Sequence, residues 1–359
     1  MKKYRYSARL FLLIEFFAMS LGLSAQEVTK EYHKEFATTP NTALEIDSRY
    51  GNVAIESWDK EQIVIDVIVR IEMPSKTRAE KALGDIEILI SEDGNTIKAR
   101  TQFSKDFNII SFGRGMNLTI NYNIKMPLKT TLKVSNSYGN TQIMNELAGL
   151  VNLNIRYGDF SIDKLSRGNE KPWNNISIAY GKGNIESAEW MSLNLSYSNI
   201  NISKSSALLI EGRYSDINIG EVSSVVCETR YGKVNVHSIK NLDMTNGYTG
   251  VRIGTLASSL KYESSYGPLT VDNIPAGFES IDINARYSDI KLGISNSAGY
   301  TLNGEARYGG IRLNEDNFEV RKRIIENNRT TLTGVVGKDD NPTSKVNINA
   351  NYTNVRLSK

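Results

Sequence analysis

The sequence contains few of the residues on which most enzyme chemistry depends. Its 359 residues include two histidines and one cysteine, which excludes a disulfide framework and leaves little for a histidine-based metal site or triad. His33 and His237 have no acidic or cysteine partner at metal-ligand or triad spacing, so we expect both to be surface residues. Cys227 occupies a mostly aliphatic position of a repeat, and we expect it to be a small buried apolar residue rather than a reactive thiol.

Long apolar runs are confined to the beginning of the chain. Residues 1–25 combine a basic start, an apolar stretch from Leu10 to Leu23 and the small pair Ser24-Ala25, a pattern typical of a secretory signal peptide. No later segment has the roughly 18 consecutive apolar residues of a membrane-spanning helix. We therefore expect export to the periplasm or the cell surface. We expect no lipid anchor, because no cysteine lies at the cleavage site.

The mature chain carries no net charge. The whole sequence has 43 Lys and Arg against 40 Asp and Glu. The signal peptide holds four of the 43 basic residues and one of the 40 acidic residues, so 39 of each remain. This balance excludes the broad basic field through which proteins bind nucleic acid, and no nucleic-acid partner is expected.

What the sequence does contain is one phrase repeated twelve times: a tyrosine, a small residue, any residue, and then apolar residues in alternation. From Tyr180 to Tyr248 the tyrosines are 17 residues apart, four times in succession. A short fixed period of this kind indicates a solenoid, in which each repeat stacks on the next. The repeated tyrosines are Tyr50, Tyr138, Tyr157, Tyr180, Tyr197, Tyr214, Tyr231, Tyr248, Tyr266, Tyr287, Tyr308 and Tyr352.

Alternating apolar residues surround each of these tyrosines. The residue five positions after the tyrosine is aliphatic in all twelve copies, and the residue six positions before it is apolar in every copy except the one with Asn174. The residue three positions after it is mostly apolar, with Thr141 and Gly183 as exceptions. A period of two indicates β-strands with one buried face. The small residue after the tyrosine suits a corner that needs unusual backbone angles.

Successive copies keep one pattern at one spacing, whereas an array of hairpins would reverse direction at every turn. We therefore predict an all-β fold, a parallel β-solenoid of about twelve short coils that forms one domain over residues 26–359. The repeat is interrupted at about 59–130 and at about 314–345. Both interruptions are expected to cover the ends of the solenoid, where bare strand edges need protection. The first contains strand patterns and a short helix at 75–83, which predicts an inserted α+β cap.

Three copies of the phrase carry a family resemblance. They are Arg49-Tyr50-Gly51-Asn52-Val53, Arg156-Tyr157-Gly158-Asp159-Phe160 and Arg230-Tyr231-Gly232-Lys233-Val234. Behind a signal peptide, these phrases resemble those of the secreted DUF4097 proteins of Bacteroidetes, a family often labelled as adhesins, and they are similar in style to head-GIN domains. The resemblance covers roughly residues 40–357. It implies a right-handed β-helical solenoid in the cell envelope and supplies no catalytic residue.

Polar side chains also recur at fixed places in the repeat. Asp159, Asp216 and Asp289 stand two residues after their tyrosines, in coils too far apart for the carboxylate pair of a glycosidase, and we interpret them as corner caps. A second column holds consecutive asparagines, which we interpret as a stabilising amide ladder. Its later basic residues are either solvated charge or a contact for acidic glycans or lipid headgroups. These residues are Asn184, Asn201, Asn218 and Asn235, followed by Arg252, Lys291, Arg312 and Arg356.

Trp173 and Trp190 are the sharpest candidates for a ligand site. Each stands seven residues before its tyrosine, and the two belong to adjacent coils, which places the rings side by side on the surface. With Arg167 and Lys171 on the neighbouring polar bulge, the pair either contacts sugars or forms a hydrophobic seal over Asn174. The repeated tyrosines, likewise, either stack as a structural ladder or offer an aromatic surface to sugars.

These observations predict an exported, non-enzymatic solenoid that acts through its surface as an adhesin-like or cell-envelope interaction protein. Glycans or other envelope proteins are the expected partners, and no catalytic residue, cofactor or metal site is expected. The alternative is a carbohydrate-active β-helix enzyme, a polysaccharide lyase or hydrolase, which the short coils and the lack of clustered acids disfavour. An accessory role in envelope signalling stays open beside the first function.

Overall fold

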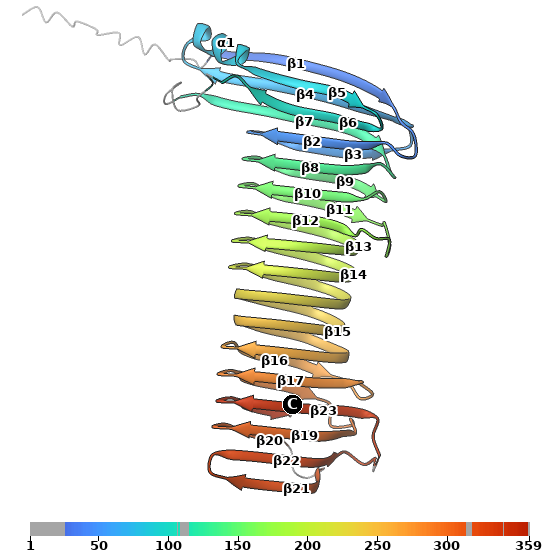
Figure 1. The fold of residues 1–359 in the computed structure, drawn as a ribbon, viewed down its shortest axis with the longest axis vertical. Helices are drawn as coiled ribbons and strands as arrows, with labels where there is room; N and C mark the ends of the chain where they lie inside the picture. Colours follow the sequence, from blue (N-terminus) through green and yellow to red (C-terminus); the bar gives the residue numbers. More distant parts are fainter. Residues whose placement is uncertain (1–25, 106, 108–114, 314–317, 340, 358–359) are drawn as a thin grey trace, which may run out of the picture.

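The chain folds into one continuous sheet that winds around a long axis (Figure 1). The computed structural model describes residues 26–105, 107, 115–313, 318–339 and 341–357, so the predicted signal peptide, residues 1–25, lies outside the described residues. Over the described residues the sheet has 24 strands, and the coils pair in parallel. The prediction of an all-β parallel solenoid is confirmed.

The elements fall into three groups along the axis. At the first end lie β1 (Gln26–Ala37), β4 (Gln62–Met73), α1 (Lys76–Gly84), β5 (Ile86–Asp93), β6 (Thr96–Phe103) and β7 (Asn117–Pro127). The regular coils contain β2 (Ala43–Arg49), β3 (Val53–Trp58), β8 (Thr131–Ser137), β9 (Thr141–Leu147), β10 (Val151–Arg156), β11 (Phe160–Leu165), β12 (Asn174–Ala179), β13 (Lys182–Ser196), β14 (Asn199–Arg213), β15 (Asp216–Ser265), β16 (Leu269–Ile274), β17 (Ser280–Arg286) and β18 (Asp289–Ile294). At the last end lie β19 (Tyr300–Arg307), β20 (Gly310–Leu313), β21 (Phe318–Glu326), β22 (Arg329–Val336), β23 (Ser344–Asn351) and β24 (Asn354–Leu357).

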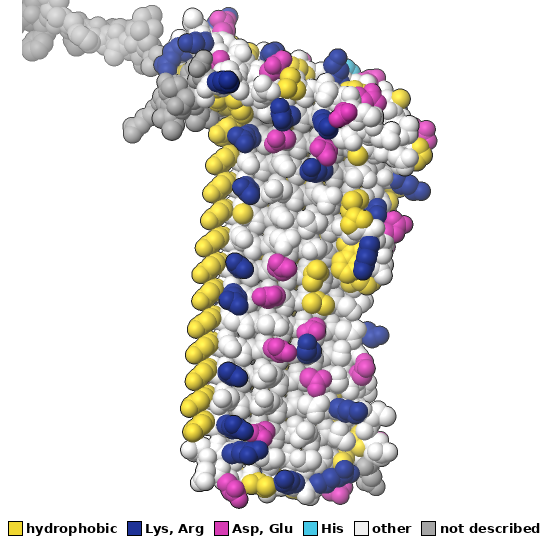
Figure 2. All heavy atoms as spheres, viewed as in Figure 1, with side chains coloured by type: hydrophobic (Ala, Val, Ile, Leu, Met, Phe, Trp, Pro, Cys, Tyr) yellow, Lys and Arg dark blue, Asp and Glu magenta, His cyan; other side chains and the backbone are white. Residues whose placement is uncertain are grey.

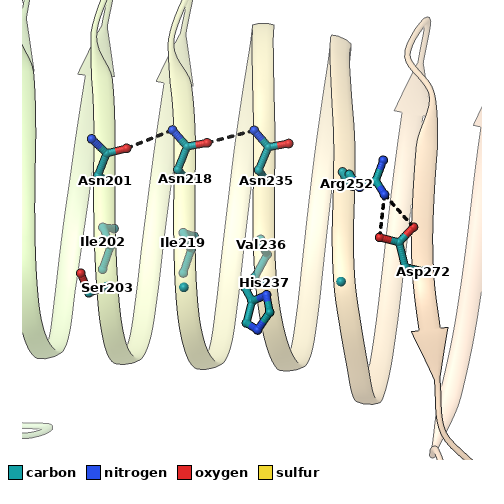
Figure 3. A pocket seen from close by; sticks show the side chains of 12 residues that line it. Asn201, Ile202, Ser203, Asn218, Ile219, Asn235, Val236, His237, Arg252 and Asp272 are labelled. Carbon is teal, nitrogen blue, oxygen red and sulfur yellow. Dashed lines mark hydrogen bonds and ion pairs between the residues drawn. The ribbon is translucent and has the colours of Figure 1, made fainter.

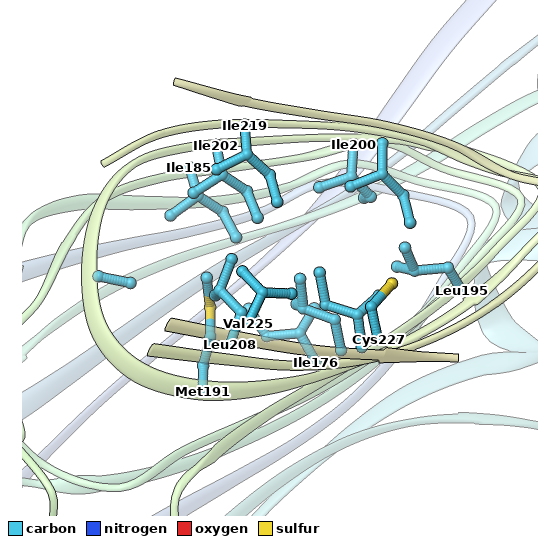
Figure 4. Close-up of a cluster of buried hydrophobic side chains, with 14 of the residues drawn as sticks. Ile176, Ile185, Met191, Leu195, Ile200, Ile202, Leu208, Ile219, Val225 and Cys227 are labelled. Carbon is cyan, nitrogen blue, oxygen red and sulfur yellow. The ribbon is translucent and has the colours of Figure 1, made fainter. Parts of the chain in front are cut away.

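Equivalent residues of successive coils lie in parallel register, and the predicted apolar columns line the interior. Isoleucines after the corner form one wall, and the residues six positions before the corner form the opposite wall (Figure 4). Each such buried aliphatic side chain contributes about 1.5–3 kcal/mol relative to an exposed one. The six residues are Ile185, Ile202 and Ile219 on the first wall and Met191, Leu208 and Val225 on the second, all buried.

The corner is made by the tyrosine itself. All twelve repeated tyrosines have a positive φ, between 49° and 62°. The sequence-based expectation that the small residue after the tyrosine takes the unusual conformation was therefore wrong. A left-handed conformation costs a residue with a side chain about 1–2 kcal/mol, so another interaction must offset this cost at every corner.

The small residue after the tyrosine is needed because neighbouring coils approach closely there. A Cβ on Gly139 would lie 1.8 Å from the carbonyl oxygen of Gly51 in the preceding coil, and one on Gly232 would lie 2.0 Å from that of Ser215. Where serine occupies this position, its hydroxyl turns back on its own strand, as in Ser215, whose Oγ donates to the carbonyl of Arg213 at 2.8 Å. Glycine occupies seven of the twelve copies of this position, and serine or threonine occupies the other five.

The two exceptions in the column three residues after the tyrosine have one cause. Thr141 and Gly183 lie in register on either side of Phe160, which is buried. A Cβ on Gly183 would lie only 2.4 Å from the Phe160 ring. The Phe160 ring therefore fills space that, in other coils, is filled by larger side chains at the positions of Thr141 and Gly183.

We expect Gly183→Val to destabilise the protein by about 1–3 kcal/mol through overpacking against the Phe160 ring. Combined with Phe160→Val, the same change is expected to cost at least about 1 kcal/mol less than the sum of the two single changes. Urea denaturation of the two single variants and the double variant measures this coupling. Additive losses would show that the ring does not fill the space above Gly183.

The first end contains an additional coil. β6 and β7 stack in parallel on β2 and β3, and Phe103 takes the place of a ladder tyrosine, edge-on to Tyr50 with ring centroids 5.8 Å apart. β4 pairs antiparallel with β7, β1 with β4, and β5 with β6. The predicted helix is present as α1, with Ser75 at its N-cap but without a side-chain capping hydrogen bond. We propose that this antiparallel group, seen at the top of Figure 1, caps the parallel stack.

At the last end, the order of stacking differs from the order of the chain. β23 lies in parallel between β17 and β19, and β24 lies in parallel between β18 and β20. The coil of Tyr352 therefore sits between the coils of Tyr287 and Tyr308. β22 pairs antiparallel with β19, and β21 pairs antiparallel with β22 as the outermost strand. We propose that β21 and β22, which fall within residues 314–345, cap this end.

Candidate functional site

The most prominent surface feature is a tyrosine ladder formed by the twelve repeated tyrosines, visible as a line of hydrophobic side chains along one edge (Figure 2). Successive rings stack with centroids 4.6–5.3 Å apart and interplanar angles of 3–13°. Because each interior ring has a tyrosine on both faces, it presents only its edge and its hydroxyl group to solvent. Stacking on a sugar needs a free ring face, so this geometry supports the structural interpretation of the ladder. The stacking offsets the backbone strain at the corners.

Two of the three predicted aspartates of the corner column, Asp159 and Asp216, hold the main chain of the next coil. Asp159 Oδ1 accepts the backbone N–H of Lys182 at 2.8 Å, and Asp216 Oδ1 accepts that of Lys233 at 2.9 Å. Both are therefore corner caps, as the sequence predicted. Neither forms part of a carboxylate pair of the kind that glycoside hydrolysis requires.

The predicted asparagine ladder is present and borders a groove (Figure 3). Each amide donates to the oxygen of the preceding one, at 2.9, 3.0 and 2.9 Å along the four residues Asn184, Asn201, Asn218 and Asn235. The groove has a volume of about 460 Å³ and is also lined by Gly220 and Gly254. A Cβ at these glycines would lie 2.4–2.5 Å from a carbonyl oxygen of the coil before, so backbone forms this part of the wall.

Trp173 and Trp190 meet as predicted, with ring centroids 5.3 Å apart and planes tilted by 40°. Both side chains are half-buried, so the rings at the surface are more covered than the sequence suggested. The Trp173 indole N–H donates to Asn169 Oδ1 at 3.1 Å, which ties the ring to the polar bulge. Beneath the rings, Asn174 is buried and its Oδ1 accepts the backbone N–H of Val151 at 2.9 Å.

The two predicted cations differ in their availability. Lys171 is exposed, and its Nζ lies 5.6 Å from the centre of the Trp173 ring, a cation–π distance. The Arg167 side chain is only 17% exposed and pairs with Glu170 at 3.5 Å. Its Nε is buried with no hydrogen-bond partner in the described part of the chain. Lys171 is therefore free to meet a ligand, whereas Arg167 is turned into the bulge.

Two apolar side chains next to the tryptophans were missed from the sequence. Leu209 and Val226 are 36% and 53% exposed and lie in register on neighbouring coils, two positions along the strand from the tryptophan column. Their column is otherwise mostly polar, so two consecutive apolar residues at an outward-facing position were the available signal. We call Trp173, Trp190, Leu209 and Val226 together the tryptophan patch.

Cys227 is buried, and His33 and His237 are both exposed. The burial of Cys227 agrees with the predicted apolar role, and it raises the pKa of the thiol to about 12. His33 is exposed as expected, but it does have acidic partners: its Nδ1 lies 2.6 Å from Asp66 and its Nε2 3.2 Å from Glu35. The hydrogen bond to Asp66 raises the His33 pKa. Antiparallel pairing of β1 with β4 brings Asp66 to His33 across 33 residues of sequence, which spacing along the chain did not reveal.

Among the described residues, no group of three or more His, Cys, Asp or Glu side chains is placed to hold a metal ion. Within the same residues, no helix has the length and apolar character needed to cross a membrane.

Comparison with known proteins identifies the family of this chain. The model of the family described as Toastrack DUF4097 matches residues 41–358. No curated protein matches the chain.

Similar solved structures include a candidate adhesin from Bacteroides fragilis, 13% identical, with 67% of this chain and 97% of that chain covered and a TM-score of 0.39. Others are a candidate cell adhesion protein from Clostridium sporogenes (13% identical, 92% and 99% covered, TM-score 0.18) and a candidate lipid-binding protein from Parabacteroides distasonis (11% identical, 92% and 97% covered, TM-score 0.35).

Proposed function

This chain belongs to the Toastrack DUF4097 family, and from that premise we propose that it is an exported, non-enzymatic, adhesin-like protein of the cell envelope. It acts through the outer surface of a stiff stack of coils. The hydrogen bonds of the recurring polar side chains support the proposal. Asp159 and Asp216 hold backbone amides and the asparagines bond to one another, so the described coils use these side chains for stability.

The observation that carries the proposal is the tryptophan patch. Side chains that repeat along the stack are explained by stacking, but Trp173 and Trp190 interrupt their column and make no repeat of their own. Leu209 and Val226 extend the apolar area, and Lys171 stands over one indole ring. Indole rings pack against the apolar face of a sugar, and a neighbouring ammonium group donates hydrogen bonds to hydroxyl or carboxylate groups. We therefore propose glycans as the ligands of this patch.

Trp173→Ala combined with Trp190→Ala is expected to weaken glycan binding at least tenfold, equivalent to about 1.4 kcal/mol, and to leave the β-sheet signal in circular dichroism intact. A glycan array probed with the mature protein measures this, with Trp58→Phe as the control. Trp58 lies in the first coil, where its indole N–H donates to the carbonyl of Gln62, so its change should leave binding unaltered.

The competing interpretation, a hydrophobic seal over Asn174, predicts a lower melting temperature and no change in the array. A wild-type protein that binds no glycan would reject the premise of a sugar ligand. Hydrolase and lyase assays on the glycans that bind test the enzymatic alternative, and turnover of any of them would contradict a purely binding function.

A further inference from the structure

Three cations from distant parts of the sequence form a continuous column near the last end of the solenoid. In the strand register, Lys291 of β18 pairs with Arg356 of β24, and Arg356 pairs with Arg312 of β20. The chain order is Lys291, Arg312, Arg356, so only the insertion of β24 between β18 and β20 makes the three residues neighbours. We call them the cationic column.

The three residues lie one strand spacing apart on neighbouring coils. The tyrosine rings of the same coils stack at 4.9 and 4.6 Å, which gives the separation of successive rungs. All three side chains are exposed, and none of them makes an ion pair within the described residues. Like charges on neighbouring coils repel one another, and a bound anion would relieve this repulsion.

Arg252 shows how the same column is neutralised elsewhere. It occupies the equivalent position after Tyr248, and its guanidinium Nη2 contacts both carboxylate oxygens of Asp272, at 2.9 and 3.2 Å (Figure 3). Asp272 lies in the coil that follows Arg252, two residues after Thr270, which is the register partner of Arg252. Among the described residues, a carboxylate therefore pairs with Arg252, and none pairs with Lys291, Arg312 or Arg356.

The cationic column borders an open cavity of about 260 Å³ that is also lined by Asp289, Asn354, Ile290 and Val355. Asp289 is the one acidic group in this lining, so the site has a net charge of about +2. Asn354 adds an amide that can donate to and accept from hydroxyl groups. Gly310, at the position equivalent to Asn354 in the next coil, leaves that side of the cavity without a side chain.

We propose that the cationic column binds a linear acidic polysaccharide that carries one carboxylate on each sugar ring. The column is one side chain wide and runs along the solenoid axis, so it fits a chain of spaced charges better than a broad membrane surface. Arginine forks bind carboxylates in a bidentate manner, and Arg356 at the centre has a cation on each side. This site goes beyond the proposed function, because it is separate from the tryptophan patch and either can fail without the other.

Titration calorimetry of the mature protein with a galacturonate oligomer tests the proposal, with a neutral glucose oligomer of equal length as the reference ligand. The triple variant Lys291→Gln, Arg312→Gln and Arg356→Gln is expected to bind the acidic oligomer at least about tenfold more weakly and with a shallower salt dependence. Arg252→Gln is the matched control, since its charge is already neutralised, and it should change affinity less than twofold.

Thermal unfolding without ligand checks that the variants are folded. The triple variant should be at least as stable as the wild type, because it removes mutual repulsion. The double tryptophan variant should keep its affinity for the acidic oligomer, which separates this site from the tryptophan patch. The proposal is overturned by an equal loss in Arg252→Gln, by equal binding of the neutral oligomer, by no binding at all, or by tighter binding to anionic lipid vesicles or to DNA than to the oligomer.

Discussion

Ile219→Asp is expected to lower the free energy of unfolding by several kcal/mol, whereas Asn218→Asp is expected to cost about 1 kcal/mol or less. The two residues are neighbours in one strand and face opposite ways. Ile219 is 4% exposed and packs in the interior next to Ile202, so the new carboxylate would be buried without a partner. Asn218 is exposed and would lose one donor to Asn201 while its oxygen still accepts from Asn235.

Urea denaturation of both variants, followed by circular dichroism, measures the difference. The identical introduced residue and the adjacent position make Asn218→Asp a matched control for charge and for strand propensity. Equal destabilisation of the two variants would mean that the inward and outward faces of this strand have been assigned wrongly.

The second large effect is expected at a tyrosine corner, where Tyr214→Val should cost about 2 kcal/mol more than Tyr214→Gly. Both changes remove the same two stacked contacts, to Tyr197 and Tyr231 at 4.8 and 4.9 Å. Residue 214 has a φ of 52°, which glycine adopts freely and a β-branched residue adopts only with strain. The variant with the smaller side chain is therefore expected to be the more stable one.

Melting temperatures and urea midpoints of the two variants give this comparison, with Tyr214→Asn as a third point. Asparagine tolerates the left-handed region better than most residues, so it should fall between glycine and valine. If valine proved as stable as glycine, the stacked rings alone would account for the corner, and the positive φ would carry no cost.

The candidate site was predictable where it depended on spacing along the chain. The pairing of Trp173 with Trp190 followed from their equal distance to successive tyrosines, and the asparagine ladder followed from four consecutive copies at one position. The burial of the indole rings and the inward turn of Arg167 did not follow. They depend on how the polar bulge folds back over the coil, which the repeat pattern does not describe.

The sequence by itself determined the period, the buried faces and the positions of nearly all strands, because alternation and repeat spacing are local properties that each coil expresses alone. Only the tertiary structure decided which coil lies on which. Repeats with equivalent columns stack on one another almost interchangeably, so pattern alone assigns no order to them. β21 and β22 form an antiparallel hairpin on β19, after which the chain returns toward the middle of the stack. The coil of Tyr352 then pairs on both sides, between the coils of Tyr287 and Tyr308. That long-range pairing creates the cationic column, whose members no spacing along the chain would have placed in this order.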